Sequence, residues 1–253
     1  MENTKTILIS NLAKYLNQEI TIQGWLHNKR GNGKIWFLEL RDGSGMVQGV
    51  IVTTEVTAEV AALTEKLTME SSLKVTGKVN LHPKKANVYE LQISNLDLIQ
   101  LAEHDYPISK KEHGVDFLME HRHLWLRSSS QWAIQRIRNN IIYETFKYFE
   151  NNGFIKFDSP ILTPNACEGT TELFDIEYFE LGKAYLSQSG QLYLEAAVMS
   201  FGRVFDFGPV FRAEKSKTRR HLTEFWMMDA ESAFVDHQGN MIIQENLIQL
   251  ILV

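Results

Sequence analysis

The sequence predicts an α+β protein with two folded parts: a β-rich N-terminal domain and a second domain of mixed helices and strands. Five segments rich in β-branched and apolar residues occupy the first hundred positions, with one helix-like segment between the third and the fourth. A polar stretch without a sustained hydrophobic period follows at residues 101–114. Beyond it, segments with a helical period alternate with short strand-like segments, so the domain boundary belongs in the polar stretch.

The β-rich part has the element order of a small barrel. Turn-forming stretches rich in Gly, Asn, Asp or Pro separate its strands. We expect strands at residues 19–27, 34–42, 46–53, 73–79 and 88–99, and a helix at residues 57–68. Three strands, a helix and two strands is the order of a five-stranded Greek-key OB barrel, in which the face of strands 2 and 3 binds oligonucleotides. The sequence therefore predicts an OB barrel over residues 1–102.

The second part, residues 128–253, follows a linker at residues 103–127. A long helix begins near Ser128, whose hydroxyl suits an N-cap, and ends at the sequence Asn-Asn-Gly, residues that tolerate the left-handed conformation. Its apolar stripe consists of Ile134, Ile137, Ile141, Ile142, Phe146 and Phe149. The remaining expected elements are a strand at 154–158, a helix at 190–201 capped by Ser189, strands at 203–214 and 224–234, and a helix at 240–253.

Composition and charge limit the class of protein. The 253 residues include one cysteine, so no intrachain disulfide can form, which fits a reducing compartment. The polar N-terminus lacks the pattern of a signal peptide, and no apolar run is long enough to cross a bilayer. We therefore expect a cytoplasmic protein without a membrane partner. Because the net charge is −5, binding of nucleic acid requires positive charge concentrated in patches.

Chemically active side chains are concentrated in the last two strands and the loop between them. Alternation along a strand places Arg212 and Glu214 on one side of the first strand, and Asp229 and Glu231 on one side of the second. An antiparallel pair would then collect an arginine and several carboxylates on one surface. The loop is strongly basic, which suits a phosphate backbone, although for the loop alone a solvated charged tip is the simpler interpretation. Its charged residues are Lys215, Lys217, Arg219, Arg220 and His221.

The segment FRAEKSKTRRHLTEF, residues 211–225, resembles motif 2 of the class II aminoacyl-tRNA synthetases in the form used by the aspartate, asparagine and lysine enzymes. The resemblance implies that Arg212 is the catalytic residue and holds the α-phosphate of ATP, because a guanidinium binds the phosphoryl oxygens on which charge develops. It implies that Glu214 helps to hold the adenine. His221 contacts ATP phosphate or tRNA, or has a structural role. The basic residues that would approach the tRNA acceptor end are Lys215, Lys217, Arg219 and Arg220.

Two upstream segments are similar to parts of the same family. Residues 153–164 (GFIKFDSPILTP) resemble motif 1, which forms the dimer interface of these enzymes, with Pro160 at the position of its proline. Residues 167–176 (CEGTTELFDI) resemble the flexible loop that closes near the amino-acid site, which implies a contact of Glu168 with the substrate's α-ammonium group. The adjacent Cys167 has no evident partner base, and the reaction needs no thiol nucleophile.

The choice of amino acid follows from residues 185–196 (YLSQSGQLYLEA) and from Asp229. In the aspartyl enzymes a lysine that pairs with the substrate side chain occupies the position of Leu194, and a neutral residue offers no counter-charge to a buried aspartate. Gln191 matches a glutamine that helps to hold the amino acid, and Ser189 lies beside it. Asp229 matches the acid that accepts a hydrogen bond from the asparagine carboxamide, where glutamate is more usual. The resemblance is therefore to the asparaginyl-tRNA synthetases.

The expected barrel strands resemble the anticodon-binding domain of the same subgroup. In residues 34–52 (KIWFLELRDGSGMVQGVIV), Phe37 and Gln48 fall where these barrels stack on and read the middle anticodon base. Aromatic stacking combined with an amide hydrogen bond is a common way to read an unstacked RNA base. Trp25, Lys29 and Arg30 would form a neighbouring part of the same surface.

The third motif of class II enzymes, a Gly-rich segment with an arginine for the γ-phosphate of ATP, has no match in the sequence. Residues 240–253 keep a helical spacing without a C-terminal cap. We therefore expect a C-terminally truncated chain that binds tRNA weakly and does not aminoacylate by itself.

Three functions are open at this stage. The first is an asparagine–tRNA ligase that uses asparagine, tRNA(Asn), ATP and Mg²⁺, with Glu231 among the metal ligands, and that acts as a homodimer. The second is an aspartyl-tRNA synthetase, which Leu194 disfavours, or an ammonia-dependent asparagine synthetase, which the N-terminal barrel disfavours. The third is a non-catalytic RNA-binding or dimerisation protein, which the missing third motif leaves open.

Overall fold

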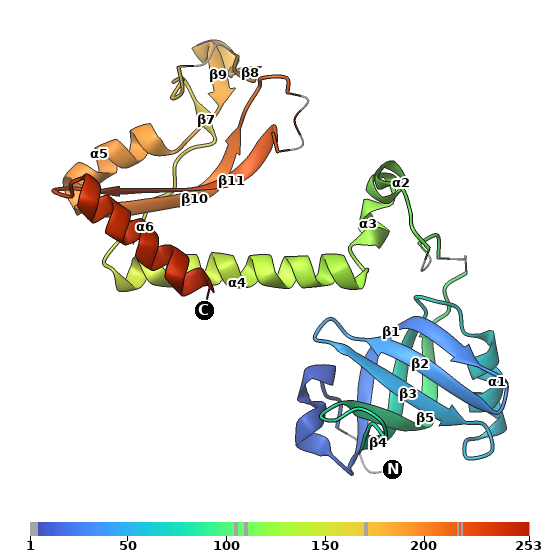
Figure 1. Ribbon diagram of the computed structural model, residues 1–253. Coiled ribbons are helices and arrows are strands. Elements are labelled where there is room, and N and C mark those ends of the chain that lie inside the picture. Colours follow the sequence, from blue (N-terminus) through green and yellow to red (C-terminus); the bar gives the residue numbers. More distant parts are fainter. Residues whose placement is uncertain are drawn as a thin grey trace. The chain divides into compact units, whose positions relative to one another are not determined.

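The computed structural model describes residues 5–103, 106–108, 111–169, 172–216, 218 and 220–252 (Figure 1). The chain divides into two compact units, Met1–Arg122 and His123–Val253. Two short helices, α2 (Val115–Glu120) and α3 (Arg122–Trp125), lie within the stretch predicted as a linker.

The first unit contains a closed barrel in which the strands follow the order β1-β2-β3-β5-β4. Its strands are β1 (Glu19–Gly31), β2 (Ile35–Arg41), β3 (Met46–Val52), β4 (Ser72–Leu81) and β5 (Tyr89–Gln100). Helix α1 (Ala58–Lys66) lies between β3 and β4, and a 3-10 helix, η1 (Ile9–Tyr15), precedes β1. This topology confirms the predicted OB barrel.

The barrel is held together by the side chains that alternate into its interior. Leu38 and Leu40 of β2, Leu73 of β4 and Leu91 of β5 are each at most 1% exposed. Val60 of α1 belongs to the same core, so the helix closes the barrel. Because the apolar residues point inward, the outer side chains of β2 and β3 are available for recognition.

Strand β1 extends beyond the predicted end, and the turn that follows it lies later in the chain. Arg30 was expected in the turn but is paired with Phe37 on β2. The turn is closed by the Asn32 side chain, which accepts two backbone hydrogen bonds across it. Gly33 has a φ of 85°, a left-handed conformation that glycine adopts without strain. The consequence is that Arg30 is held in the sheet.

The second unit is built on a three-stranded sheet of order β11-β10-β6, with β10 antiparallel to β11 and parallel to β6. The strands are β6 (Ile155–Lys156), β10 (Arg203–Phe211) and β11 (Glu224–Ser232). The helices are α4 (Ser129–Asn151), α5 (Gln191–Phe201) and α6 (His237–Leu252). A smaller sheet of order β7-β9-β8 consists of β7 (Leu162–Thr163), β9 (Lys183–Leu186) and β8 (Asp175–Glu177), with η2 (Phe179–Leu181) between β8 and β9.

The two faces of β10 pack against different helices. On one face Phe205 stacks on Phe149 of α4, with ring centroids 4.7 Å apart, and the Tyr148 hydroxyl ties α4 to α6 by donating to the Ile243 carbonyl at 2.8 Å. On the other face Val204 packs against the core residues of α5. The face of the sheet that carries α5 is therefore the one left for a site, because α4 and α6 cover the other.

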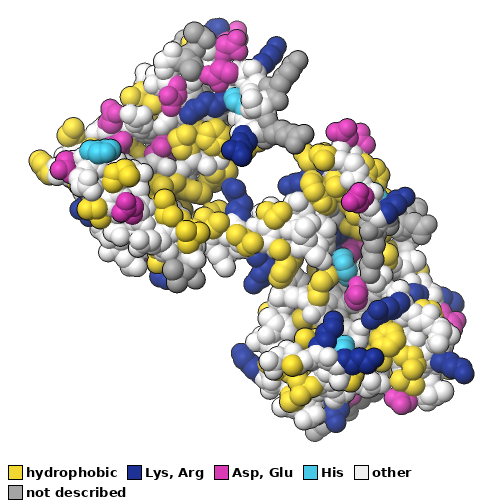
Figure 2. Space-filling view, in the orientation of Figure 1, with side chains coloured by type: hydrophobic (Ala, Val, Ile, Leu, Met, Phe, Trp, Pro, Cys, Tyr) yellow, Lys and Arg dark blue, Asp and Glu magenta, His cyan; other side chains and the backbone are white. Residues whose placement is uncertain are grey.

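Helix α4 buries only part of its apolar stripe. Phe149 is 1% exposed, but Ile134, Ile137 and Ile141 are 51%, 59% and 42% exposed. Together with Phe207 these isoleucines line a hollow of about 380 Å³, and apolar side chains lie along this surface in the space-filling view (Figure 2). The predicted apolar stripe is therefore buried only toward the C-terminal end of α4. No helix in the described part of the chain is long and apolar enough to cross a membrane.

Candidate functional site

The β10–β11 hairpin gathers charged side chains on the face of the sheet that carries α5. Asp206 lies directly opposite Asp229 in the antiparallel pair, so the two share a face, and Glu231 shares it by alternation. Arg212 follows the end of β10, where its backbone N–H donates to the Thr223 carbonyl at 2.9 Å and closes the base of the loop. The hairpin thus places one arginine and three carboxylates along a single surface.

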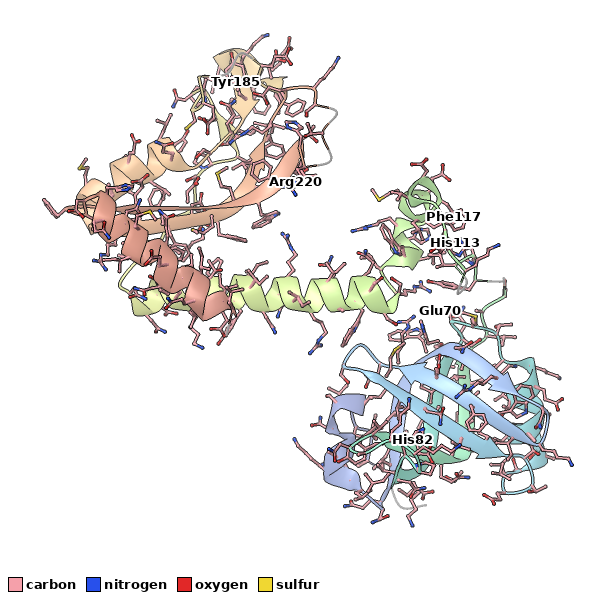
Figure 3. The ribbon with its side chains drawn as sticks, viewed as in Figure 1. Glu70, His82, His113, Phe117, Tyr185 and Arg220 are labelled. Carbon is pink, nitrogen blue, oxygen red and sulfur yellow. The ribbon has the colours of Figure 1, made fainter. Side chains whose placement is uncertain are left out.

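The loop end of the hairpin surrounds a cavity of about 610 Å³. Its lining residues are Arg212, Glu214, Arg220, His221, Leu222 and Phe225, and Arg220 lies on the loop that joins the two strands (Figure 3). The Arg212 guanidinium carbon is 5.6 Å from the centroid of the Phe225 ring. Nε2 of His221 is buried and has no hydrogen-bond partner among the described residues, so a polar ligand group would satisfy it. Two arginines beside an aromatic ring suit a ligand that is both anionic and planar.

Arg212 is held by contacts with Gln188, just before α5, and with Glu168. One guanidinium nitrogen donates to the Gln188 carbonyl, and the other lies 3.4 Å from a carboxylate oxygen of Glu168. The backbone N–H of Glu168 in turn donates to the side-chain oxygen of Gln188 at 3.1 Å. The Arg212 side chain is 19% exposed, so it lies against these residues and does not extend into solvent.

Asp229 and Ser189 form a hydrogen-bonded group next to Gln188. Oδ2 of Asp229 accepts a hydrogen bond from the Ser189 hydroxyl at 2.9 Å and another from the Gly190 backbone N–H at 3.2 Å. Ser189 was predicted to cap α5, but the N-cap position belongs to Gly190. From one position earlier Ser189 still serves the helix end, because its oxygen accepts from the Gln191 N–H at 3.1 Å while its hydroxyl proton is directed to Asp229. Within the described residues Oδ1 of Asp229 has no partner and is available as an acceptor.

Gln191, which was predicted to bind the amino acid, and two nearby residues of the segments compared with the family have different surroundings. Gln191 is exposed on α5, and its side-chain nitrogen donates to Glu195 at 2.9 Å. Burial raises the pKa of the Cys167 thiol, so its thiolate is disfavoured, in agreement with the prediction that this residue is not a nucleophile. Leu194 is completely buried in the core between α5 and the sheet, so it provides packing and no charge.

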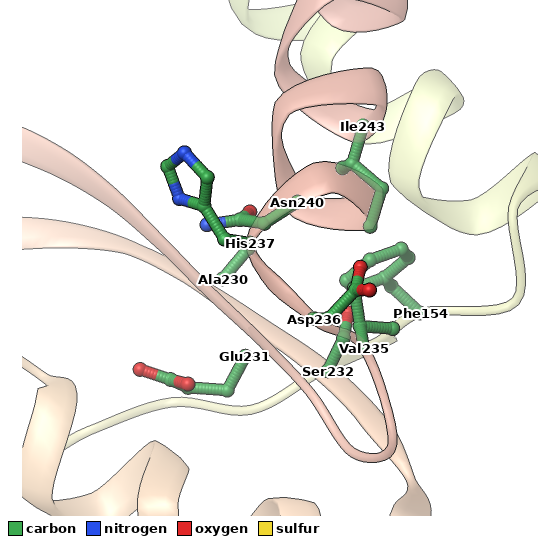
Figure 4. A pocket seen from close by; sticks show the side chains of 9 residues that line it. All are labelled: Phe154, Ala230, Glu231, Ser232, Val235, Asp236, His237, Asn240 and Ile243. Carbon is green, nitrogen blue, oxygen red and sulfur yellow. The ribbon is translucent and has the colours of Figure 1, made fainter.

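Glu231 lies in a strongly negative part of the surface. It borders a cavity of about 180 Å³ near the start of α6, and its carboxylate points away from Asp236 and Ile243 (Figure 4). Burial raises the pKa of Glu231, and the nearby charges of Glu195 and Asp229 raise it further. No group of three His, Cys, Asp or Glu side chains in the described chain is arranged to hold a metal ion. Mg²⁺ needs only one or two carboxylates when phosphate oxygens and water complete its shell, so Glu231 fits a shared Mg²⁺ site.

The outer face of the barrel brings together three of the predicted anticodon-binding residues. The Arg30 guanidinium lies 5.2 Å from the centroid of the Phe37 ring and donates to the side-chain oxygen of Gln48 at 3.0 Å. The side-chain nitrogen of Gln48 donates to Glu90 at 3.4 Å. Glu90 was not among the predicted residues, because its position beside Gln48 depends on the parallel pairing of β3 with β5.

Trp25 and Lys29 lie apart from this group. Trp25 is near the other end of the β1–β2 pairing, where the Arg41 guanidinium lies 5.2 Å from its ring centroid. The Lys29 ammonium donates to the backbone carbonyls of Thr64 and Glu65 at 3.0 and 2.9 Å, near the C-terminal end of α1. Burial lowers the pKa of Lys29. These contacts give Lys29 a role in anchoring α1 to the barrel.

The remaining predicted residues lie on the hairpin loop and after β6. Lys215 is exposed on the loop, whereas Lys217 and Arg219 lie outside the described residues. Pro160 is exposed and follows Ser159. The sequence analysis missed Lys156, Ser159 and Asp206, which form hydrogen bonds beside the Asp229 group, because residues so far apart in the sequence carry no common motif.

Comparison with known proteins agrees with this combination of fold and site. Residues 114–252 match the family model of the class II tRNA synthetases (D, K and N), and residues 20–100 match that of the OB-fold nucleic acid binding domain. The chain therefore belongs to the class II tRNA synthetases of the aspartate, lysine and asparagine group.

Within that group, similar proteins include several asparagine enzymes. The asparagine–tRNA ligase of Chloroflexus aurantiacus is 51% identical over 246 residues, which are 97% of this chain and 56% of that protein. The crystal structure of asparaginyl-tRNA synthetase from Pyrococcus horikoshii complexed with asparaginyl-adenylate has a TM-score of 0.90 at 33% identity, covering 100% of this chain and 58% of that chain. A putative aspartyl-tRNA synthetase from Leishmania major has a TM-score of 0.82 at 26% identity, covering 99% and 52%. The chain thus spans just over half the length of these relatives.

Proposed function

We propose that the protein containing this chain uses ATP to ligate asparagine to tRNA(Asn) through an asparaginyl-adenylate. The observation that carries this proposal is the position of Arg212. Its guanidinium lines the 610 Å³ cavity and also donates a hydrogen bond to the backbone carbonyl of Gln188. The next residue, Ser189, donates its hydroxyl proton to Asp229. A nucleotide phosphate in the cavity and an amino acid beside Asp229 would therefore both lie next to this guanidinium.

The cavity supports the activation of an amino acid by ATP. The amino-acid carboxylate attacks the α-phosphorus, the bond to the pyrophosphate oxygen breaks, and negative charge develops on the phosphoryl oxygens. Arg212 binds that charge, and the protein needs to supply no nucleophile of its own. Phe225 and Glu214 would hold the adenine, and the unpartnered Nε2 of His221 would bind a polar atom of the nucleotide.

The Asp229 group supports asparagine as the amino acid. The carboxamide NH2 of asparagine can donate to Oδ1 of Asp229, while Oδ2 remains bound to Ser189 and Gly190. The side chain of aspartate offers no such donor and would be repelled by the Asp229 carboxylate. Glu168 would bind the α-ammonium group, and Gln191 would help to hold the amino acid at the start of α5.

The barrel and the hairpin loop supply two separate surfaces for tRNA. On the barrel, Phe37 would stack on an anticodon base, with Gln48 and Arg30 as the polar groups that read it. On the loop, Lys215 and Arg220 would contact phosphates of the acceptor end. Trp25 and Lys29 support the barrel surface through their contacts with Arg41 and α1.

The proposal includes a homodimer, a metal ion and a cytoplasmic location. The exposed isoleucines of α4 and the exposed Pro160 would form the dimer interface. Glu231 would share Mg²⁺ with phosphate oxygens of ATP, and the ion would supply neutralisation of phosphate charge. One cysteine in the sequence agrees with a reducing compartment.

The experiment that tests the proposal is ATP–pyrophosphate exchange with asparagine, with aspartate and without an amino acid. The complete gene product should show exchange that depends on asparagine and exceeds that with aspartate by about 100-fold. Arg212→Ala should abolish the exchange, whereas Arg136→Ala, which removes an exposed arginine of α4, should leave it unchanged. The 253-residue chain should show none, because its sequence has no match to the γ-phosphate motif.

Other outcomes would identify the alternatives. Exchange that depends on aspartate would indicate an aspartyl enzyme. Binding of tRNA without exchange by the complete gene product would indicate a non-catalytic RNA-binding protein.

A further inference from the structure

We infer that Asp206 is a positioning residue of the amino-acid site, which holds the Ser189–Gly190 turn in place together with Ser159 and Lys156. The inference rests on the proposed function and extends it to side chains that do not contact the substrate. Asp206 is only 7% exposed, although it is charged and lies on a sheet beside an open site. A carboxylate in such a place is stable only when it is bound by hydrogen-bond donors and balanced by a cation.

Both oxygens of Asp206 are bound, and they connect segments distant in the sequence. Oδ1 accepts a hydrogen bond from the Lys156 ammonium at 3.0 Å, and Oδ2 accepts one from the Ser159 backbone N–H at 3.2 Å. The Ser159 hydroxyl donates to the Gly190 carbonyl at 3.4 Å. Asp206 on β10 thus fixes the chain after β6, and that chain contacts the turn before α5.

The turn approaches Asp206 so closely that any side chain at position 190 would displace the side chains of Ser159 and Asp206. A Cβ atom at position 190 would lie 2.6 Å from the Ser159 hydroxyl oxygen and 2.7 Å from Oδ2 of Asp206. The backbone N–H of the same glycine donates to Asp229. Gly190 therefore lies between the carboxylates of two paired strands. It packs closely against Asp206 of β10 and donates a hydrogen bond to Asp229 of β11.

Lys156 balances the charge of this arrangement. Asp206 and Asp229 lie directly opposite each other, and like charges in that position destabilise a sheet. Burial lowers the pKa of Lys156, but hydrogen bonds and charge from Asp158 and Asp206 outweigh that effect and raise it. The lysine therefore remains a cation bound to Asp206, and it offsets the negative charge of that carboxylate on the sheet where Asp206 faces Asp229.

The loss of the Asp206 carboxylate should weaken the binding of asparagine more than that of ATP. If Asp206 loses its charge, the Ser159 N–H and the Lys156 ammonium compete for one remaining acceptor, and the Ser189–Gly190 turn loses its support. Ser189 and Asp229 then no longer present their polar atoms in a fixed arrangement. The nucleotide cavity around Arg212 is lined by other residues and is bounded by the hairpin loop. Its link to the turn is the bond from Arg212 to the Gln188 carbonyl, and Arg212 also contacts Glu168 and Phe225, so the KM for ATP should change less than the KM for asparagine.

The first test compares Asp206→Asn with Asp158→Asn in the complete gene product. Asp158 also pairs with Lys156, but its side chain is 91% exposed, so it is a matched control. In Asp206→Asn the KM for asparagine should rise by roughly tenfold while the KM for ATP changes by less than about twofold. Asp158→Asn should change neither by more than about twofold. Equal changes in both KM values, or no change in the KM for asparagine, would overturn the inference.

The second test does not depend on activity. Hydrogen–deuterium exchange without substrates should become faster across residues 187–191 in Asp206→Asn and stay unchanged in Asp158→Asn. Unchanged exchange in both variants would overturn the inference even if the enzyme activates asparagine. In a further outcome, the wild type fails to activate asparagine while hydrogen–deuterium exchange across residues 187–191 still becomes faster in Asp206→Asn. That outcome would reject the proposed function and support the structural role of Asp206.

Discussion

At the residue scale, Asp229 is the side chain expected to select asparagine over aspartate. The change Asp229→Asn keeps the size of the side chain and removes the charged acceptor. It should raise the KM for asparagine by about 10-fold to 100-fold and reduce the preference over aspartate, because a hydrogen bond to a charged group is lost. Exchange assays with both amino acids measure this, with Asp175→Asn as the control, since Asp175 is exposed and its partner among the described residues is Lys183, at 2.6 Å. An unchanged preference would remove Asp229 from the specificity site.

A second residue-scale prediction concerns the pH dependence of stability through Glu231. Its pKa is raised above the ordinary value of 4.5, so the folded state favours the protonated form. Its contribution to stability is therefore complete below pH 4.5 and is lost as the pH rises through the raised pKa. Glu231→Gln removes this loss, so its thermal unfolding midpoint should exceed that of the wild type at pH 7 and match it at pH 4. Scans are run without ATP and Mg²⁺, and a variant less stable at pH 7 would contradict the prediction.

The sequence could identify Arg212, Ser189 and Asp229 as members of one site because each lies in a segment that resembles a family motif. It could not separate Lys29 from Arg30, because the predicted strand ended at residue 27, whereas β1 continues to Gly31. The bulge after Leu26 also shifts the alternation of faces along β1. It could not identify Asp206 either. Its partners Lys156 and Ser159 lie some fifty positions earlier, and only the parallel pairing of β6 with β10 brings them together.

At the scale of elements, α4 presents an apolar row that the described residues of its own unit leave exposed. Ile137→Glu places a charge in the middle of the row, so a dimer formed there should dissociate into monomers, which sedimentation velocity measures. Because Ile137 is 59% exposed, the fold of the monomer should tolerate the change. Gln135→Glu adds the same charge at another exposed position and should leave the dimer intact. A dimeric Ile137→Glu variant would place the interface elsewhere.

Most of the elements that the sequence predicted have a long hydrophobic pattern, and the two-residue strand β6 is the exception. The five barrel strands, α4, α5 and the β10–β11 hairpin have enough alternating or helical positions to define them. Strands β7, β8 and β9 have four residues or fewer and exist through pairing with one another, so no local pattern marks them. The pattern of α4 predicted the helix correctly but could not predict which of its apolar residues are buried within the unit. An apolar stripe looks the same in the sequence whether it packs into the core of its own chain or stays exposed for a second molecule.

At the scale of the whole molecule, the net charge of −5 opposes binding of RNA, so affinity must come from a few local cations. Arg30→Ala in the first unit and Arg220→Ala in the second should each weaken tRNA binding and flatten its dependence on salt concentration. The two arginines share no described partner, so the changes in binding free energy should add in the double variant. Filter binding at several salt concentrations measures both effects, with Lys147→Ala as the control. An unchanged salt dependence in both variants would contradict the assignment of these surfaces.

The two units differ in how they can associate through their backbones. The barrel closes on itself, so each of its strands has a neighbour on both sides. In the second unit β11 borders its sheet and pairs only with β10 among the described strands. Its outer row of N–H and C=O groups, along Glu224–Ser232, is open to a further strand. Strand addition, whether by a folding partner or by unwanted aggregation, is therefore expected at the sheet edges of the second unit, of which β11 is the longest, and not at the barrel.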